Sequence, residues 1–455
     1  MQGVDWLSDP DAAFAQARAG ARPLFLYWGA SWCPPCNRIK ATVFSSPGFA
    51  ELAQSFVALH IDGDGPGAQR LAERFHLRSY PTLVVFRSDG AEVTRLPCEL
   101  APARFIEILK VALAARLTAA QSLSAALSRE RPLSDDEWRL LSYYSWDTDE
   151  HQLLKNLDLA ATFASMRGGC TLPDAALRLE WHALHAAAVS GKGGIDQRAA
   201  AARLEETLAD PRAVRGQMDI VTNQAVDLVR FLTPADSDQR VALTHAWAAA
   251  LARIESDSTV NVADQLAALR TRVRMSRLGA AIPHLADTAR ASVAAAVGAV
   301  DAGNEPALRH QVINTAAGVL SDAGLLDEAE LLLRDELDAS HAPFYFMHNL
   351  AAIARKRGDP ARMVGWYEQA WLRATGPATR LQWGATYLQA LLEFLPHELE
   401  RIERFSAATL AELNGMDDAF SQRNGTQMHR IAAKLALQDR AVGPHTAALR
   451  EAVQR

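Results

Sequence analysis

The sequence has little cysteine for its length, with only Cys33, Cys36, Cys98 and Cys170 in 455 residues. So sparse a set cannot form the disulfide framework that supports small secreted domains. A reducing compartment is the simplest setting for such a chain, so we expect a cytoplasmic protein. A periplasmic location is the alternative, because a signal peptide trimmed from the chain would leave the same composition.

Two further features are missing, a long apolar run and an excess of basic charge. Charged residues interrupt every alanine-rich segment, so no stretch reaches the roughly 20 apolar residues of a transmembrane helix. The first residues carry Asp5, Asp9 and Asp11, where a secretory signal would have its apolar region. The chain has 47 Lys and Arg against 53 Asp and Glu, a net charge of -6. We therefore expect no membrane partner and no nucleic-acid partner.

The length favours two or more domains, and the residue pattern changes near position 115. Before that point, apolar runs of strand length alternate with helical periods, and Ser88-Asp89-Gly90 provides a turn for a hairpin. The expected strands are 22–29, 56–62, 82–86 and 92–96, and the expected helices include 69–75 and 102–113. This order predicts an α/β domain over residues 1–115, with a mixed sheet and helices on both faces.

Residues 116–455 have helical periods almost throughout and no convincing strand. Ser134 and Glu137 have the spacing of a capping box, which predicts a helix start before Trp138. We therefore expect a large all-α domain that follows the α/β domain.

A weak repeat is clearest at about residues 310–395. Gly324 and Gly358 lie 34 residues apart, each between two helical segments, and Ala329 and Met363 follow the same period. This period resembles that of tetratricopeptide repeats, although that family usually places Ala where Met363 stands. Irregular helical pairs are the alternative. Either arrangement gives a helical array, an architecture that commonly presents a binding groove.

The chemistry of the sequence lies in its Cys-Pro-Pro-Cys motif at residues 33–36. A zinc site would need a second pair of ligands at similar spacing, and the sequence has none, so we expect neither metal nor cofactor. Two thiols at this spacing at a helix start can instead close a disulfide. Helix-terminal amides stabilise the thiolate of Cys33, the attacking thiol, and Cys36 resolves the mixed disulfide.

Trp32-Cys33-Pro34-Pro35-Cys36, together with Tyr80-Pro81-Thr82 at a strand start, resembles the thioredoxin family over roughly residues 1–113. The resemblance implies a thioredoxin-like fold and thiol–disulfide exchange. It also implies that Pro81 is cis and faces the dithiol, and that Tyr80 offers backbone groups to an extended substrate. Trp32 completes this implied substrate rim.

The sequence departs from the family at three positions. Tyr27 and Ala58 stand where the family usually has a buried aspartate and a lysine, so we name no general base. Cys98 stands where the family usually has a glycine that lines the substrate groove. Cys98 is either a further resolving or sensing thiol that pairs with Cys33, or a small residue that fills a small space.

The dipeptide between the cysteines indicates a direction of electron flow. Proline has no N–H to offer a thiolate, and dithiol oxidants place a histidine in this dipeptide instead. The thiolate should therefore be only modestly stabilised, as in a reductant nearer the roughly -270 mV of thioredoxin than the roughly -120 mV of a strong oxidant.

These features predict a protein-disulfide reductase with a helical domain that binds a client protein. Its expected partners are a protein disulfide substrate, a reductase or dithiol donor, and the client. One alternative is an adaptor or chaperone in which the dithiol is a redox switch. Another is a peroxide-reducing or isomerase activity.

Overall fold

The computed structural model describes residues 3–150, 152–192, 194–278, 285–303, 306–436 and 443–453. The chain forms two compact units that we describe separately. The first unit comprises Met1–Tyr27, Pro34–His60 and Pro81–Leu325, and the second comprises Trp28–Cys33, Ile61–Tyr80 and Leu326–Arg455. The division of the sequence near residue 115 stays a prediction.

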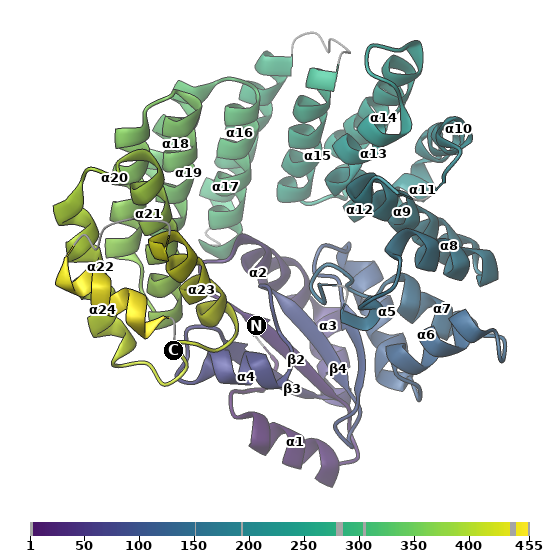
Figure 1. The fold of residues 1–455 in the computed structure, drawn as a ribbon. Coiled ribbons are helices and arrows are strands. Elements are labelled where there is room, and N and C mark those ends of the chain that lie inside the picture. Colours follow the sequence, from purple (N-terminus) through teal and green to yellow (C-terminus); the bar gives the residue numbers. More distant parts are fainter. Residues whose placement is uncertain are drawn as a thin grey trace. The chain divides into compact units, whose positions relative to one another are not determined.

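A five-stranded sheet in the order β1-β3-β2-β4-β5 forms the centre of the N-terminal part. Figure 1 labels its three inner strands, β2, β3 and β4. The pairing of β1 with β3 is parallel and that of β4 with β5 is antiparallel, so the sheet is mixed as expected. Every residue of β2 and β4 is buried, which explains why both appear in the sequence as continuous apolar runs. The strands are β1 (Trp6–Leu7), β2 (Leu24–Gly29), β3 (Val57–Asp62), β4 (Thr82–Phe86) and β5 (Glu92–Leu96).

The helices of the same part begin where the sequence supplies caps and prolines. Asp9 accepts hydrogen bonds from the first amides of its helix, and Ser46 does the same for a later one. The helices are α1 (Pro10–Ala19), α2 (Pro34–Ile39), a π-helical turn (Lys40–Phe44), α3 (Pro47–Leu52), α4 (Ala68–Arg74) and α5 (Pro102–Ala114). The expected strands and helices are all present, but β1 and α3 were not foreseen because both are short.

In the described residues beyond 115 the chain is helical, without a strand. The helices of the first unit are α6 (Ala119–Ser128), α7 (Asp135–Ser142), α8 (Leu159–Gly169), α9 (Pro173–Ser190), α10 (Gln197–Ala209), α11 (Pro211–Gly216), α12 (Met218–Asn223), α13 (Ala225–Leu232), α14 (Asp238–Ser256), α15 (Val262–Met275), α16 (Leu285–Gly303) and α17 (Pro306–Asp322). Those of the second unit are α18 (Leu326–Asp335), α19 (Pro343–Lys356), α20 (Pro360–Arg373), α21 (Pro377–Phe394), α22 (Leu399–Leu413), α23 (Gln422–Ala436) and α24 (Pro444–Ala452).

The local signals of the helical part have the expected geometry. Ser134 and Glu137 form a reciprocal capping box at the start of α7. Gly324 and Gly358 have φ angles of +85° and +72°, in turns that join α17 to α18 and α19 to α20. Glycine adopts this left-handed conformation without strain, which explains why both turns carry it. The resemblance of these helix pairs to tetratricopeptide repeats stays a prediction.

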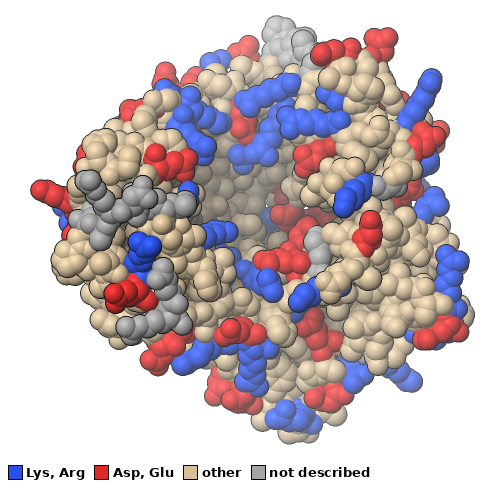
Figure 2. All heavy atoms as spheres, in the orientation of Figure 1, with Lys and Arg blue, Asp and Glu red and all other residues tan. Residues whose placement is uncertain are grey.

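None of the described helices is long and apolar enough to cross a membrane. Lys, Arg, Asp and Glu side chains are intermixed over the face shown in Figure 2. This distribution reflects the near balance of 47 basic and 53 acidic residues.

Candidate functional site

The dithiol motif lies between the end of β2 and the first turn of α2. Cys33 directly precedes α2, and Pro34 and Pro35 occupy its first turn, where a missing N–H costs no helical hydrogen bond. Both cysteines are free thiols, and they are 3% and 0% exposed for Cys33 and Cys36. The first thiol is therefore far less exposed than an attacking group on an open surface would be.

Within the first unit, Arg38 of α2 connects the motif helix to the helical part of the chain. Its Nε and Nη2 donate to the two carboxylate oxygens of Asp264 in α15, at 2.8 and 2.6 Å. Its Nη1 also donates to the backbone oxygen of Cys98, at 2.9 Å. Arg38 is 4% exposed, so this ion pair is buried and each partner depends on the other. Helix α17 packs against α2 in the same unit.

Cys98 lies in the turn between β5 and α5 and is partly buried. Burial and the negative charge of Glu99 raise the pKa of the Cys98 thiol well above its usual value. A protonated thiol is a weak nucleophile, so this environment favours the packing role over the attacking one. The pairing of Cys98 with Cys33 stays a prediction.

The position that the family usually fills with a buried aspartate carries an aromatic pair here. The Tyr27 ring is fully buried and stacks on His60, with ring centroids 4.7 Å apart. The Lys40 ammonium lies 5.7 Å from the centroid of the Tyr27 ring. Packing of rings therefore replaces the acid at this position.

In the second unit, Trp32 is surrounded by side chains of the C-terminal helices. Its Nε1 donates to Oγ1 of Thr379, at 2.7 Å. Its ring stacks on Tyr345, with centroids 5.9 Å apart, and meets Trp383 edge-on at 5.4 Å. Trp32 is only 7% exposed, so this residue of the implied substrate rim already contacts α19 and α21.

Asp64, in the loop that follows β3, accepts hydrogen bonds from the first turn of α21. Its carboxylate accepts hydrogen bonds from the backbone N–H of Thr379, at 2.7 Å, and from the Thr379 hydroxyl. Burial raises the pKa of Asp64. Gly376, just before α21, has a φ angle of +90°, and a Cβ there would lie 2.5 Å from Cγ of Asp64. Glycine is therefore required at this position for the carboxylate to reach the helix.

The other implied rim residues divide between the two units, with Tyr80 in the second and Pro81 in the first. The Arg423 guanidinium lies 4.6 Å from the centroid of the Tyr80 ring, and the Tyr80 hydroxyl accepts from Nε2 of Gln69. Pro81 is buried immediately before β4. Side chains of the C-terminal helices thus contact Tyr80 as well as Trp32.

Helix α4 is capped by a residue far away in the sequence. The Asp418 carboxylate accepts from the backbone N–H of Gln69, at 2.9 Å, in the first turn of α4. Helix α23 packs against α4 in the same unit.

Sequence reasoning did not find the residues that surround the motif, of which the main ones are Arg38, Asp64, Asp264, Thr379 and Tyr345. Asp64 lies in an Asp-Gly-Asp-Gly stretch that indicates only a turn, and Trp383 has a helical spacing typical of core residues. No local signal connects these residues to the motif, because their partners are hundreds of residues away.

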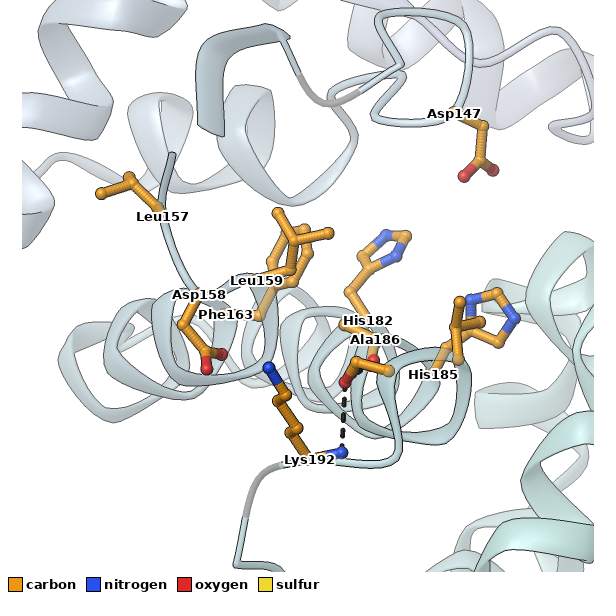
Figure 3. A pocket seen from close by; sticks show the side chains of 11 residues that line it. Asp147, Leu157, Asp158, Leu159, Phe163, His182, His185, Ala186 and Lys192 are labelled. Carbon is orange, nitrogen blue, oxygen red and sulfur yellow. Dashed lines mark hydrogen bonds between the residues drawn. The ribbon is translucent and has the colours of Figure 1, made fainter. Parts of the chain in front are cut away.

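Two adjoining hollows lie in the first unit. One, with a volume of about 140 Å³, is lined by Cys98 and by residues that include Trp146, Arg178 and Gln224. The other, of about 300 Å³, lies at α8 and α9, and Figure 3 shows His182 and His185 projecting from α9 at its wall. Among the described residues, no group of three or more His, Cys, Asp or Glu side chains could hold a metal ion.

Comparison with known proteins places the similarity in the N-terminal part. Residues 10–113 match the family model described as a thioredoxin-like domain. Thiol:disulfide interchange protein DsbD 1 of Pseudomonas aeruginosa is 31% identical over 84 residues, which are 18% of this chain and 14% of that protein. Thioredoxin H-type of Oryza sativa subsp. indica is 33% identical over 89 residues, which are 19% of this chain and 66% of that protein. The chain therefore spans less than two thirds of either relative.

Two solved structures were also compared. A thioredoxin from Thermus thermophilus has 30% identity and a TM-score of 0.22, over 24% of this chain and 86% of that one. The oxidoreductase DsbH has 21% identity and a TM-score of 0.23, over 25% of this chain and 86% of that one. The family match and the observed sheet show that the chain has an N-terminal thioredoxin-like α/β domain followed by a large helical array.

Proposed function

We propose that this chain is a thiol–disulfide oxidoreductase that works as a protein-disulfide reductase. The observation that carries the proposal is a Cys-Pro-Pro-Cys dithiol at the start of α2 in a thioredoxin-like domain. The names of the relatives, a thiol:disulfide interchange protein and a thioredoxin, describe the same chemistry.

The reaction is a pair of thiol–disulfide exchanges. The Cys33 thiolate attacks one sulfur of the substrate disulfide, that bond breaks, and the leaving sulfur takes up a proton. Cys36 then loses its proton and attacks the Cys33 sulfur of the mixed disulfide, which releases the second substrate thiol. Two electrons have passed to the substrate and a Cys33–Cys36 disulfide remains. A separate reductase or dithiol donor must reduce it for the next turnover.

Reduction of insulin disulfides by the full chain, with dithiothreitol as donor, tests this function. We expect activity in the unchanged chain and in Cys170→Ser, because Cys170 lies between α8 and α9. Cys33→Ser should have none. Activity that persists in Cys33→Ser would overturn the assignment, as would turnover of peroxide or of scrambled disulfides without net reduction.

The direction of electron flow has its own test. Equilibration of the full chain with a glutathione redox buffer should give a potential nearer to roughly -270 mV than to -120 mV, because neither proline adds a cation or an amide to the thiolate. A potential well above about -200 mV would contradict the reductase assignment.

The helical part is proposed to bind the client. The hollow at α8 and α9 supports this role, since its apolar lining includes Leu157 and Val189, which are 45% and 72% exposed. Apolar side chains at a hollow suit a client segment with apolar residues of its own. Figure 3 shows Asp147, Asp158 and Lys192 at the same hollow, where they add polar groups.

A Cys36→Ser background makes the client role measurable, because it stops the reaction at the mixed disulfide. We expect Val189→Asp to lower the yield of trapped client several-fold. Val241→Asp is the control, since Val241 is also exposed but lies on α14, away from the hollow. Equal yields from both variants would remove this hollow from the proposal.

A second candidate function is a binding module that the dithiol switches. The contacts of Trp32 with α19 and α21 favour it, because oxidation of Cys33 changes the residue next to one that those helices hold. Hydrogen exchange of α19 and α21 should then differ between the reduced and oxidised chains. Identical exchange in both states would exclude a switch that acts through these helices.

A further inference from the structure

We propose that α19 and α21 form a cover over the Trp32 side of Cys33, and that this cover must be displaced before Cys33 reacts with a disulfide. The cover consists of Tyr345, Thr379 and Trp383. The inference rests on the proposed thiol–disulfide exchange and adds to it a restriction on access.

The cover forms a hydrogen bond and two ring contacts with the indole of Trp32. Thr379 accepts from the indole N–H, Tyr345 stacks on the ring, and Trp383 meets it edge-on. Stacked and edge-on aromatic pairs add attraction beyond the burial of area. A substrate that packs against Trp32 therefore competes with side chains of this same chain.

The cover also has polar attachments of its own. The Asp64 carboxylate receives both the backbone N–H and the hydroxyl of Thr379, so a charged group holds the first turn of α21. Nε2 of His341, just before α19, lies 3.1 Å from the backbone oxygen of Ser31, two residues before Cys33. Within the second unit, α21 is thus attached to the loop that follows β3, and His341 contacts the backbone that leads to Cys33.

The Cys33 thiol itself is buried. Cys33 is 3% exposed, although attack on a protein disulfide requires the sulfur to reach a partner sulfur. The contacts of Tyr345, Thr379 and Trp383 with Trp32 and Asp64 are hydrogen bonds and ring contacts, so they can separate without breaking a covalent bond. A client or partner that displaces Tyr345 and Thr379 would open the site.

The rate at which N-ethylmaleimide alkylates Cys33 tests the cover without requiring reductase activity. Peptide-resolved mass spectrometry of the reduced full chain follows Cys33 separately from the other thiols. The test variants are Thr379→Val, which keeps the shape and the backbone hydrogen bond to Asp64 but loses the hydroxyl bonds to Trp32 and Asp64, and Tyr345→Ala, which loses the stacking. Thr386→Val is the matched control, because it lies in the same helix and its hydroxyl donates to the backbone oxygen of Gln382.

We expect alkylation of Cys33 to be roughly tenfold faster in Thr379→Val, and faster again when Tyr345→Ala is added, since each change weakens the closed state. Thr386→Val should match the unchanged chain. The rates are compared on the plateau of the pH profile, where Cys33 is fully ionised, so that a changed thiol pKa cannot imitate improved access.

Equal plateau rates in all variants would overturn the cover, and so would a rate in the unchanged chain equal to that of the unfolded chain. Insulin reduction, measured on the same variants before alkylation, separates the two proposals. Faster alkylation without insulin reduction in any variant would support the cover and reject the reductase function. Insulin reduction with unchanged alkylation would support the reductase function and reject the cover.

Discussion

At the scale of single residues, Trp32 makes contacts that its motif does not predict. The Trp-Cys-Pro-Pro-Cys motif predicts an indole beside a reactive thiol, and the structure adds a hydrogen bond to Thr379 and ring contacts with Tyr345 and Trp383. Tyr80 is similar, because Arg423 lies over its ring. Two of the residues that the resemblance assigns to the substrate rim, Trp32 and Tyr80, thus also make contacts within the second unit.

Gly376 gives a prediction at this scale. In Gly376→Ala, the new Cβ would lie 2.5 Å from the Asp64 carboxylate, and alanine would have to adopt a φ angle of +90°. We expect a loss of roughly 1–3 kcal/mol in the free energy of unfolding. Urea denaturation measures it.

The control for this change is Gly415→Ala, because the nearest atom to a Cβ at Gly415 is 3.6 Å away. If Gly376→Ala cost no more than the control, the close approach of Asp64 to α21 would be wrong.

At the scale of elements, buried ion pairs connect helices that are distant in the sequence. Arg38 and Asp264 join α2 to α15. Arg178 of α9 and Asp219 of α12 form a second pair, with Nη2 and Oδ2 2.6 Å apart and Arg178 2% exposed. Such pairs do not need to raise stability overall, but each makes the loss of one partner costly.

Substitution of Arg38 by methionine should therefore lower the free energy of unfolding by roughly 3–5 kcal/mol, since it leaves the Asp264 carboxylate without its partner. The exposed pair of Arg87 and Asp89 is the control, and Arg87→Met should cost far less, because water screens an exposed ion pair. Similar costs for both changes in thermal or chemical denaturation would show that the first pair is not buried in solution.

A second prediction at this scale concerns pH. Partial burial alone would raise the pKa of Asp322, but the ion pairs with Arg270 and Arg274 of α15 lower it to about 2. Because this pKa is below the value of 3.8 in the unfolded chain, its contribution is present above pH 3.8. It is lost as the pH falls through about 2.

The contribution amounts to about 2 kcal/mol. Asp322→Asn should lower stability by about that amount at pH 7 and should flatten the fall in stability between pH 5 and pH 2. Asp327→Asn is the control, because the Asp327 side chain is 97% exposed. A pH profile unchanged by Asp322→Asn would mean that these ion pairs do not persist in solution.

At the scale of the whole molecule, the compact units cut across the thioredoxin-like domain. Residues 28–33 and 61–80 belong with the C-terminal helices, while the remainder of that domain belongs with the helices up to residue 325. A fragment that ends near residue 115 would lack the partners of Trp32, Arg38 and Asp64. Within each unit, the residues of the thioredoxin-like domain therefore depend on the later helices for buried contacts.

A substitution that destabilises one unit should therefore affect mainly those residues of the thioredoxin-like domain that belong to that unit. Leu388→Ala removes a fully buried side chain from the core of the second unit, and we expect a cost of roughly 2–5 kcal/mol. Hydrogen exchange of residues 61–80 should become faster in this variant. Leu251→Ala removes an equally buried leucine from the first unit and should leave residues 61–80 closer to the unchanged chain.

If both leucine variants accelerated exchange of residues 61–80 equally, the second unit would not unfold as a separate cooperative unit.

The sequence alone determined the features that depend on neighbours along the chain. The apolar runs of β2 and β4, the capping box at Ser134 and the positions of the two cysteines are local patterns of composition and spacing. The mixed sheet followed by helices could be predicted from them. The short strand β1 could not, because two residues carry too little periodicity to be recognised.

Only the tertiary structure decided what surrounds the motif. Thr379 lies 347 positions from Trp32, and Asp264 lies 226 positions from Arg38, so no local pattern could relate them. Their pairing depends on how the helices pack, which one sequence does not reveal. The positions of the two thiols are therefore determined by sequence, whereas the contacts of Trp32 beside Cys33 are determined by the helices that fold against it.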